Sequence, residues 1–204
     1  MKTLILVDVQ NDFMPGGPLE VPQGNKIVPV INKVQEYFDL VVATQDWHPK
    51  NHKSFASNHS NKKPFDNIVL NGVQQTLWPD HCIQGSLGAE LHEDIEMKRI
   101  AAIFRKGMDP EIDSYSGFYD NNHWLRTGLS GYLKEKGSSE IHFCGLASDI
   151  CVYYTILDSI QEGFSATLIE DASRPLFPDK FDDMKGELTK LGVHIINSID
   201  LHPK

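Results

Sequence analysis

Six short runs of apolar and β-branched residues recur along the chain with few polar interruptions. They cover residues 3–9, 40–44, 100–105, 140–145, 165–170 and 193–197. A strand covered on both faces of a sheet is hydrophobic at nearly every position, whereas a strand exposed on one face alternates between apolar and polar residues. The pattern therefore predicts six buried strands.

Four stretches between these runs carry apolar residues at every third or fourth position, which places those residues on one face of a helix. The stretches are residues 24–38, 124–136, 149–163 and 178–191. Strands that alternate with helices form βαβ units and a parallel sheet, and 204 residues are a usual length for one domain. We predict a single domain over residues 1–204 with three α/β/α layers and a central six-stranded, mostly parallel, Rossmann-like sheet.

One segment, residues 45–97, interrupts this alternation because it is long, polar and rich in His, Asn, Pro and Trp. Long loops in compact domains are often functional. We expect burial of its aromatic side chains, Trp47, Phe55, Phe65 and Trp78, to hold the segment in place. It is therefore predicted to be an insertion that carries a metal site and part of a substrate pocket.

Four reactive side chains stand where predicted strands end. Asp8, Asp46 and Lys106 lie at the ends of three of the runs, and Cys151 follows the fourth after one short turn. In an open parallel sheet, ligands bind outside the carboxyl ends of the strands. We therefore predict that the four side chains share one crevice and form a reaction centre.

The turn before Cys151, Gly145-Leu146-Ala147-Ser148-Asp149-Ile150, consists mostly of small residues and leads from a strand into a helix. Unpaired backbone N–H groups at a helix start favour a thiolate and can also form an oxyanion hole. Cys151 is therefore the predicted nucleophile, with a buried structural cysteine as the alternative. For Cys82 and Cys144 we prefer the structural interpretation.

An acidic side chain at the end of an otherwise apolar strand needs a polar pocket or an ionic partner. Asp8 is therefore interpreted as a general base beside the cysteine, with a purely structural ion pair as the alternative. Lys106 is expected to lower the pKa of the thiol and to keep Asp8 ionised. Taken alone, a lysine at a strand end is more often a solvated charge.

A candidate metal site combines Asp46 and His48, two residues apart, with His81 from a more distant loop. One carboxylate and two imidazoles suit zinc, iron or manganese better than calcium or magnesium. Spacing alone supports this site and a set of surface histidines about equally, since no compact ligand motif is present. His52 stays open as a further ligand, and His59 is left out.

The net charge and the cysteine content limit which binding partners and which cellular compartment are expected. The net charge is −9 and the longest basic run is the pair Lys62-Lys63, so neither nucleic acid nor an anionic membrane is expected as a partner. No apolar stretch is long enough to span a bilayer, and Asp8 interrupts the apolar start too early for a secretory signal. Three cysteines without CxxC spacing indicate a reduced, cytoplasmic setting. A homo-oligomer stays open.

Six short motifs occur in order along the chain. They are Val7-Asp8-Val9-Gln10-Asn11-Asp12-Phe13, Gln45-Asp46-Trp47-His48-Pro49, Trp78-Pro79-Asp80-His81-Cys82, Arg105-Lys106-Gly107, Asp113-Ser114-Tyr115-Ser116-Gly117-Phe118 and Gly145-Leu146-Ala147-Ser148-Asp149-Ile150-Cys151-Val152. Together they resemble the bacterial nicotinamidases of the isochorismatase-like hydrolase superfamily, and the resemblance covers nearly the whole chain. Each motif is a weak signal alone, but six in the family's order are specific.

The resemblance implies an isochorismatase-like fold and an Asp-Lys-Cys catalytic triad that falls on Asp8, Lys106 and Cys151. It also implies an oxyanion hole formed by the backbone N–H groups of Ala147 and Cys151. A cis peptide bond is expected between Ala147 and Ser148.

For the metal, the resemblance implies one divalent ion held by Asp46, His48 and His81. Zinc is expected first, with iron or manganese as alternatives. His52 is a ligand in some family members and only a neighbour of the metal in others. Metal-free relatives in the superfamily generally lack these ligand motifs, so their presence favours a nicotinamidase.

The implied activity is hydrolysis of nicotinamide to nicotinate and ammonia, a reaction of NAD salvage, through a thioester on Cys151, with pyrazinamide as a side substrate. Phe13 and Trp78 are expected to flank the ring, although each alone is more often a core residue. Ile150 replaces an aromatic residue common in close relatives and Gly117 stands where alanine is frequent, which leaves the tolerance for substituted rings open. The alternatives are a related hydrolase acting on a different amide or a vinyl ether, and a non-catalytic metal-binding protein. A disulfide oxidoreductase is disfavoured by the absence of a CxxC partner.

Overall fold

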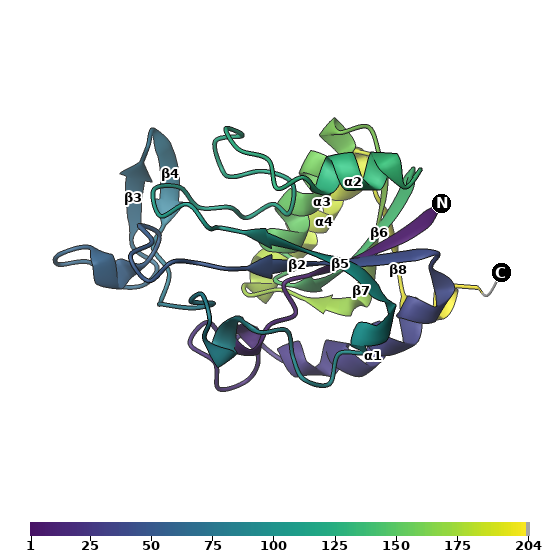
Figure 1. The fold of residues 1–204 in the computed structure, drawn as a ribbon, viewed down its shortest axis with the longest axis horizontal. Helices are drawn as coiled ribbons and strands as arrows, with labels where there is room; N and C mark the ends of the chain where they lie inside the picture. The colour runs from purple at the N-terminus through teal and green to yellow at the C-terminus, as the bar shows by residue number, and fades with distance from the viewer. Residues whose placement is uncertain (203–204) are drawn as a thin grey trace.

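The computed structural model describes residues 1–202, so the last two residues of the predicted domain lie outside the described part. At its centre is one sheet of six strands in the order β5-β2-β1-β6-β7-β8 (Figure 1). The strands are β1 (Lys2–Val7), β2 (Leu40–Asp46), β5 (Ile100–Lys106), β6 (Glu140–Leu146), β7 (Ser165–Arg174) and β8 (His194–Ile196). Every neighbouring pair is parallel. All six predicted strands are present and the sheet is entirely parallel, but the edge strands β5 and β8 are only partly buried.

Helices cover both faces of this sheet and make a single three-layer α/β domain (Figure 1). One face carries α1 (Val28–Val34), and the other carries α2 (Leu129–Glu135), α3 (Cys151–Gln161) and α4 (Pro178–Lys190). Short 3₁₀ helices complete the described part, at Asn11–Phe13, Gly24–Ile27, Gln35–Tyr37, Ala56–Asn58, Leu87–Ala89, Met97–Arg99 and Ser198–Asp200. Within residues 1–202 no helix combines the length and apolar character that a membrane crossing requires.

Burial on both faces explains the uninterrupted hydrophobic run of β1. Leu4 and Leu6 pack in the core on the α1 side, whereas Ile5 and Val7 pack in the core on the side of α2, α3 and α4. The strand ends at Val7, two residues earlier than predicted, because Asp8 adopts the left-handed backbone conformation with φ of 48°. The chain therefore turns away from the sheet at the residue that carries the first reactive group.

The predicted helices are all present, but two are shorter than the apolar spacing indicated. Within residues 24–38 only α1 is α-helical, with 3₁₀ turns on either side. The helix predicted over residues 124–136 begins at Leu129, since the N–H groups of Trp124 and Leu125 donate to the Asp120 carboxylate. Gly128, with φ of 92°, then turns the chain into α2.

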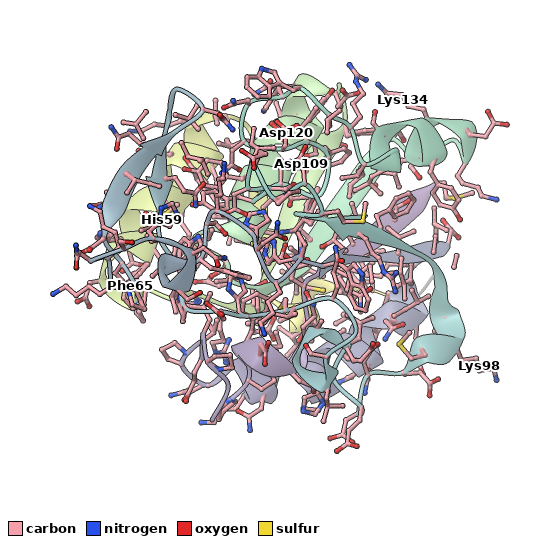
Figure 2. The ribbon with its side chains drawn as sticks, turned by 60° about the vertical axis from the view of Figure 1, so that its left-hand side comes forward. His59, Phe65, Lys98, Asp109, Asp120 and Lys134 are labelled. Atoms are coloured by element: carbon pink, nitrogen blue, oxygen red, sulfur yellow. The ribbon has the colours of Figure 1, made fainter. Side chains whose placement is uncertain are left out.

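The insertion between β2 and β5 extends beyond the end of the sheet and contains a two-stranded antiparallel hairpin, β3 (Asn67–Leu70) and β4 (Val73–Thr76) (Figure 1). This hairpin was not among the predicted elements. Phe55 and Trp78 are buried, as expected of anchors, but the expectation for Phe65 is wrong because 51% of its surface is exposed. Figure 2 shows Phe65 and His59 together on the outer flank of the molecule.

Candidate active site

Four neighbouring strands bring reactive groups to one edge of the sheet. Asp8 directly follows β1, and Asp46 and Lys106 are the last residues of β2 and β5. Cys151 is the first residue of α3, which follows β6 after a short turn. Because the strands are parallel, their carboxyl ends lie at the same edge. The structure brings the four side chains together and buries all of them.

The ammonium group of Lys106 lies at the centre of this cluster. Its Nζ is 2.9 Å from Asp8 Oδ2 and 2.6 Å from Asp46 Oδ1. The same nitrogen is 3.6 Å from Cys151 Sγ and donates a hydrogen bond of 2.7 Å to the carbonyl oxygen of Ser114. One buried cation therefore connects two carboxylates and a thiol.

Burial and the lysine charge set the protonation of the cluster. Burial raises the pKa of Asp8, and the Lys106 ammonium offsets only part of that effect. Burial also raises the pKa of Cys151 well above its usual value, which outweighs the lowering by Lys106. Although burial lowers the pKa of Lys106, the carboxylates of Asp46 and Asp8 raise it well above its ordinary value. Lys106 thus lowers the pKa of Cys151 as expected, but burial has the larger effect and favours the protonated sulfur.

Thr44 is a member of the cluster that the sequence did not single out. It lies on β2, two residues before Asp46, and its Oγ1 donates a hydrogen bond of 2.6 Å to Asp8 Oδ1. A hydrogen bond to the ionised carboxylate lowers the pKa of Asp8. The available signal was a polar side chain inside an otherwise apolar run.

Asp46, His48 and His81 place three ligand atoms within 4.8 Å of one another. Asp46 Oδ2 lies 3.4 Å from His48 Nε2 and 3.8 Å from His81 Nε2. The opposite ring nitrogens contact backbone carbonyls, with Nδ1 of His48 2.9 Å from Gly107 and Nδ1 of His81 2.8 Å from Pro79. Such outer contacts orient metal-binding histidines. The donor set fits a divalent ion such as zinc, iron or manganese.

Local backbone contacts place His48 and the loop of His81 beside each other. The N–H of His48 donates to the Cys82 carbonyl, and the N–H of Gln84 donates to the His48 carbonyl. Gly107 has φ of 64°, and a Cβ at this position would lie 2.3 Å from the His48 ring. Only glycine therefore lets that ring pack against the backbone carbonyl that it contacts.

His52 lies beside the three ligand candidates and not among them. Its ring centroid is 4.5 Å from that of His48, and with His48 and Asp113 it forms a second group of possible ligand atoms. Its Nδ1 accepts a hydrogen bond of 3.1 Å from the Ser54 N–H, and its Nε2 is 3.3 Å from the Ile112 carbonyl. Because both ring nitrogens of His52 already have partners, the structure favours His52 as a neighbour of the candidate metal site and not as a metal ligand.

A pocket open to solvent lies beside Cys151. Phe13 and Trp78 form part of its wall, and Asp46 and His81 line it as well. Other wall residues, none of which the sequence had assigned to the site, include Leu19, Val21, Asp113, Tyr115 and Leu176. A mostly apolar wall with a few polar groups is typical of sites for small molecules.

The turn between β6 and α3 contains a cis peptide bond between Leu146 and Ala147. The expectation of a cis bond between Ala147 and Ser148 is therefore wrong. The Ser148 N–H donates a hydrogen bond of 2.8 Å to the Arg174 carbonyl, which continues the pairing of β6 with β7 past the end of β6.

Two N–H groups of this turn stay available for a ligand. The carbonyl of Ala147 accepts hydrogen bonds from the N–H groups of Ile150 and Val152, at 3.0 and 3.1 Å. In the described residues, the turn and loop hydrogen bonds include none from the N–H of Ala147 or Cys151 to a backbone carbonyl. These are the two donors expected to form the oxyanion hole.

The other two cysteines, Cys82 and Cys144, are buried and are not candidates for the nucleophile. Cys144 is on β6, where its Sγ is 3.7 Å from the Ile5 carbonyl, and Cys82 is fully buried beside His81. Burial raises the pKa of both thiols. Their environment supports the structural interpretation.

The sequence and fold are similar to those of known amidases. The isochorismatase domain family matches residues 2–200. A nicotinamidase of Acinetobacter baylyi is 46% identical over 185 residues, which cover 91% of this chain and 84% of the relative. A nicotinamidase of Escherichia coli is also 46% identical, over 85% of this chain and 83% of the relative.

Three solved structures share the fold. The Acinetobacter baumanii nicotinamidase and pyrazinamidase superposes with a TM-score of 0.95 at 44% identity and covers 98% of both chains. A protein of L. infantum in complex with nicotinate has a TM-score of 0.88 at 38% identity, over 100% of this chain and 96% of the other. The pyrazinamidase of Pyrococcus horikoshii in complex with zinc has a TM-score of 0.76 at 35% identity, over 96% and 98%.

Proposed function

The chain belongs to the isochorismatase family, and we propose that it is a nicotinamidase that hydrolyses nicotinamide to nicotinate and ammonia. The observation that carries the proposal is the contact of Lys106 with Asp8, Asp46 and Cys151 beside an aromatic-lined pocket. This contact joins a nucleophile, an acid–base group and a candidate metal ligand within reach of one small molecule. The nicotinamidases at 46% identity support the choice of substrate.

In the first half of the proposed reaction, Asp8 accepts the proton of the Cys151 thiol as sulfur adds to the carboxamide carbon. Because burial favours the protonated sulfur, we propose that this transfer accompanies the attack. The N–H groups of Ala147 and Cys151 hold the oxyanion, and one such donor contributes roughly 3–4 kcal/mol in a comparable protease. Asp8 then returns the proton to the amide nitrogen, the carbon–nitrogen bond breaks, and ammonia leaves a thioester on Cys151.

In the second half, Asp8 removes a proton from water as the water oxygen attacks the thioester carbon. The carbon–sulfur bond breaks, the proton on Asp8 restores the Cys151 thiol, and the product departs as nicotinic acid, which loses its remaining proton to solvent to give nicotinate. Lys106 stays protonated throughout and stabilises the carboxylate of Asp8 whenever that group is ionised. The cycle divides one slow amide hydrolysis into two easier acyl transfers.

Phe13 and Trp78 are proposed to flank the pyridine ring in the pocket. Asp46, His48 and His81 are proposed to hold one divalent ion, zinc first, and a zinc-bound relative of the same fold supports this choice. Such an ion would act as a Lewis acid toward the pyridine ring, orienting the ring and withdrawing electron density from it. His52 is proposed as a neighbour that packs on His48.

The test is ammonia release from nicotinamide by the purified protein, before and after metal removal with a chelator. We expect release that falls on chelation and returns with zinc, iron or manganese. If ammonia release is unchanged after confirmed loss of the metal, the protein would still be a cysteine amidase, but the proposed role of the metal would be rejected. No release by the metal-loaded protein would reject nicotinamide as the substrate, and pyrazinamide and other amides would then be compared.

A further inference from the structure

The side-chain amide of Gln10 pairs with the backbone of Asp46. Its Oε1 accepts a hydrogen bond of 2.8 Å from the Asp46 N–H, and its Nε2 donates one of 2.8 Å to the Asp46 carbonyl. The same Nε2 lies 2.8 Å from the carbonyl of Ala89, in the loop that follows His81. Gln10 is fully buried, so water cannot replace these contacts.

The position of Gln10 follows from the way in which β1 ends. β1 pairs with β2 only up to Leu6 and Ala43, and the chain turns away at Asp8. On its other side, β2 stays paired with β5 as far as Asp46. Buried backbone N–H and carbonyl groups require partners. The amide of Gln10 therefore takes the place of the missing strand and completes the hydrogen bonds of Asp46.

We propose that Gln10 is a positioning residue, which fixes the backbone of Asp46 so that its carboxylate faces His48 and His81. The inference rests on the metal site of the proposed function. Asp12, two residues later, makes a parallel contact: its Oδ2 accepts a hydrogen bond of 2.6 Å from the Cys82 N–H, next to His81. The segment that follows β1 thus holds the backbone at or next to two of the three candidate ligands.

Gln45 provides a matched control within the same structure. It is also buried, it precedes Asp46, and its Nε2 donates to the same Ala89 carbonyl, at 2.9 Å. Its Oε1 accepts from the Arg105 side chain and not from the Asp46 backbone. Loss of either glutamine amide removes a bond to Ala89, but only the change at Gln10 releases Asp46.

The experiment compares Gln10→Met with Gln45→Met by zinc dissociation constants, measured by competition with a chromophoric chelator. The visible absorption of the cobalt-loaded proteins reports ligand geometry at the same site. We expect Gln10→Met to weaken zinc binding about 10- to 100-fold, the usual effect of losing an outer contact of a metal ligand, and to alter the cobalt spectrum. Gln45→Met should bind zinc within about twofold of the wild type.

Gln10→Glu is the second variant if Gln10→Met does not fold. It keeps an acceptor for the Asp46 N–H but replaces the donor that faces two carbonyls, and it should also weaken zinc binding. Tight zinc binding by the wild type with equal constants for the Gln10 variants would overturn this inference alone, as would equal losses in the Gln10 and Gln45 variants. Failure of the wild type to bind zinc, cobalt or iron would overturn the proposed metal site itself.

Discussion

The Nζ of Lys106 lies 2.6 Å from Asp46 Oδ1, so the lysine of the proposed triad forms an ion pair with a proposed metal ligand. Its distance to Asp8 Oδ2 is 2.9 Å. Burial tends to raise the pKa of Asp46, but Lys106 and His48 hold it well below its usual range. The two halves of the site therefore share one charge, and a change at Lys106 should affect both.

Lys106→Met should abolish most activity and destabilise the fold. Removing one partner of a buried ion pair typically costs about 3–5 kcal/mol, because an uncompensated charge stays buried. We expect ammonia release to fall at least about 100-fold, together with a lower midpoint of urea unfolding. Lys185→Met is the control, since Lys185 also bridges two carboxylates, Glu170 at 2.6 Å and Asp182 at 2.9 Å, but at the surface. Lys185→Met should lower the free energy of unfolding by at most about 1 kcal/mol. Similar losses in both variants would contradict the role of Lys106.

Thr44→Val should move the acidic limb of the pH–rate profile to higher pH. The lost hydroxyl donates to the ionised form of Asp8, so its removal favours the protonated form and raises the pKa. Since the base must be ionised to accept the thiol proton, the limb in kcat/KM should shift upward by about one unit. Thr3→Val is the matched control, because Thr3 is also a buried strand threonine, bonded to Ser138. If the acidic limb does not move in Thr44→Val, or moves equally in Thr3→Val, the hydrogen bond from Thr44 to Asp8 does not set the pKa of the base.

The end of β1 could be predicted because this strand is buried on both faces. In β1 the first polar residue after the apolar run, Asp8 after Val7, marks the carboxyl end. In β2 the polar residues Thr44 and Gln45 come before the end of the strand at Asp46. Parallel pairing then brings distant residues to one edge without knowledge of the strand order. The β3–β4 hairpin could also have been predicted, because an Asn-Gly pair is a strong hairpin signal in a sequence. In the structure Asn71 and Gly72 form the turn between the two strands, with φ of 49° and 88°.

The charge state and the fine contacts of the site could not be read from the sequence. Whether Cys151 is a thiol or a thiolate depends on the balance between burial and the Lys106 charge, and the degree of burial is set by the whole fold. The contact of Thr44 with Asp8 depends on the register between β1 and β2. None of these follows from local spacing.

Cys151→Ala and His48→Ala should separate the chemistry from the metal. Cys151→Ala removes the proposed nucleophile but none of the three candidate ligands, so turnover should be lost while zinc content stays at the wild-type level. His48→Ala removes a ligand, so bound zinc measured by elemental analysis should fall, and activity with it. Residual turnover near the wild-type rate in Cys151→Ala would reject the thioester mechanism. Unchanged zinc content in His48→Ala would place the metal elsewhere.

His142 should make the fold less stable in mild acid. It is buried on β6 against Phe38, and burial lowers its pKa from 6.5 to about 4. Between these values the unfolded chain binds more protons than the folded one, so the free energy of unfolding should fall as pH drops from 6.5 towards 4. This group should contribute roughly 1–2 kcal/mol to the loss between pH 7 and 5. Urea unfolding of the wild type and His142→Gln at both pH values checks this. At pH 7 the variant should have a lower free energy of unfolding than the wild type, but this free energy should fall less between pH 7 and pH 5. An equal fall in the two proteins would show that His142 is not the group that titrates.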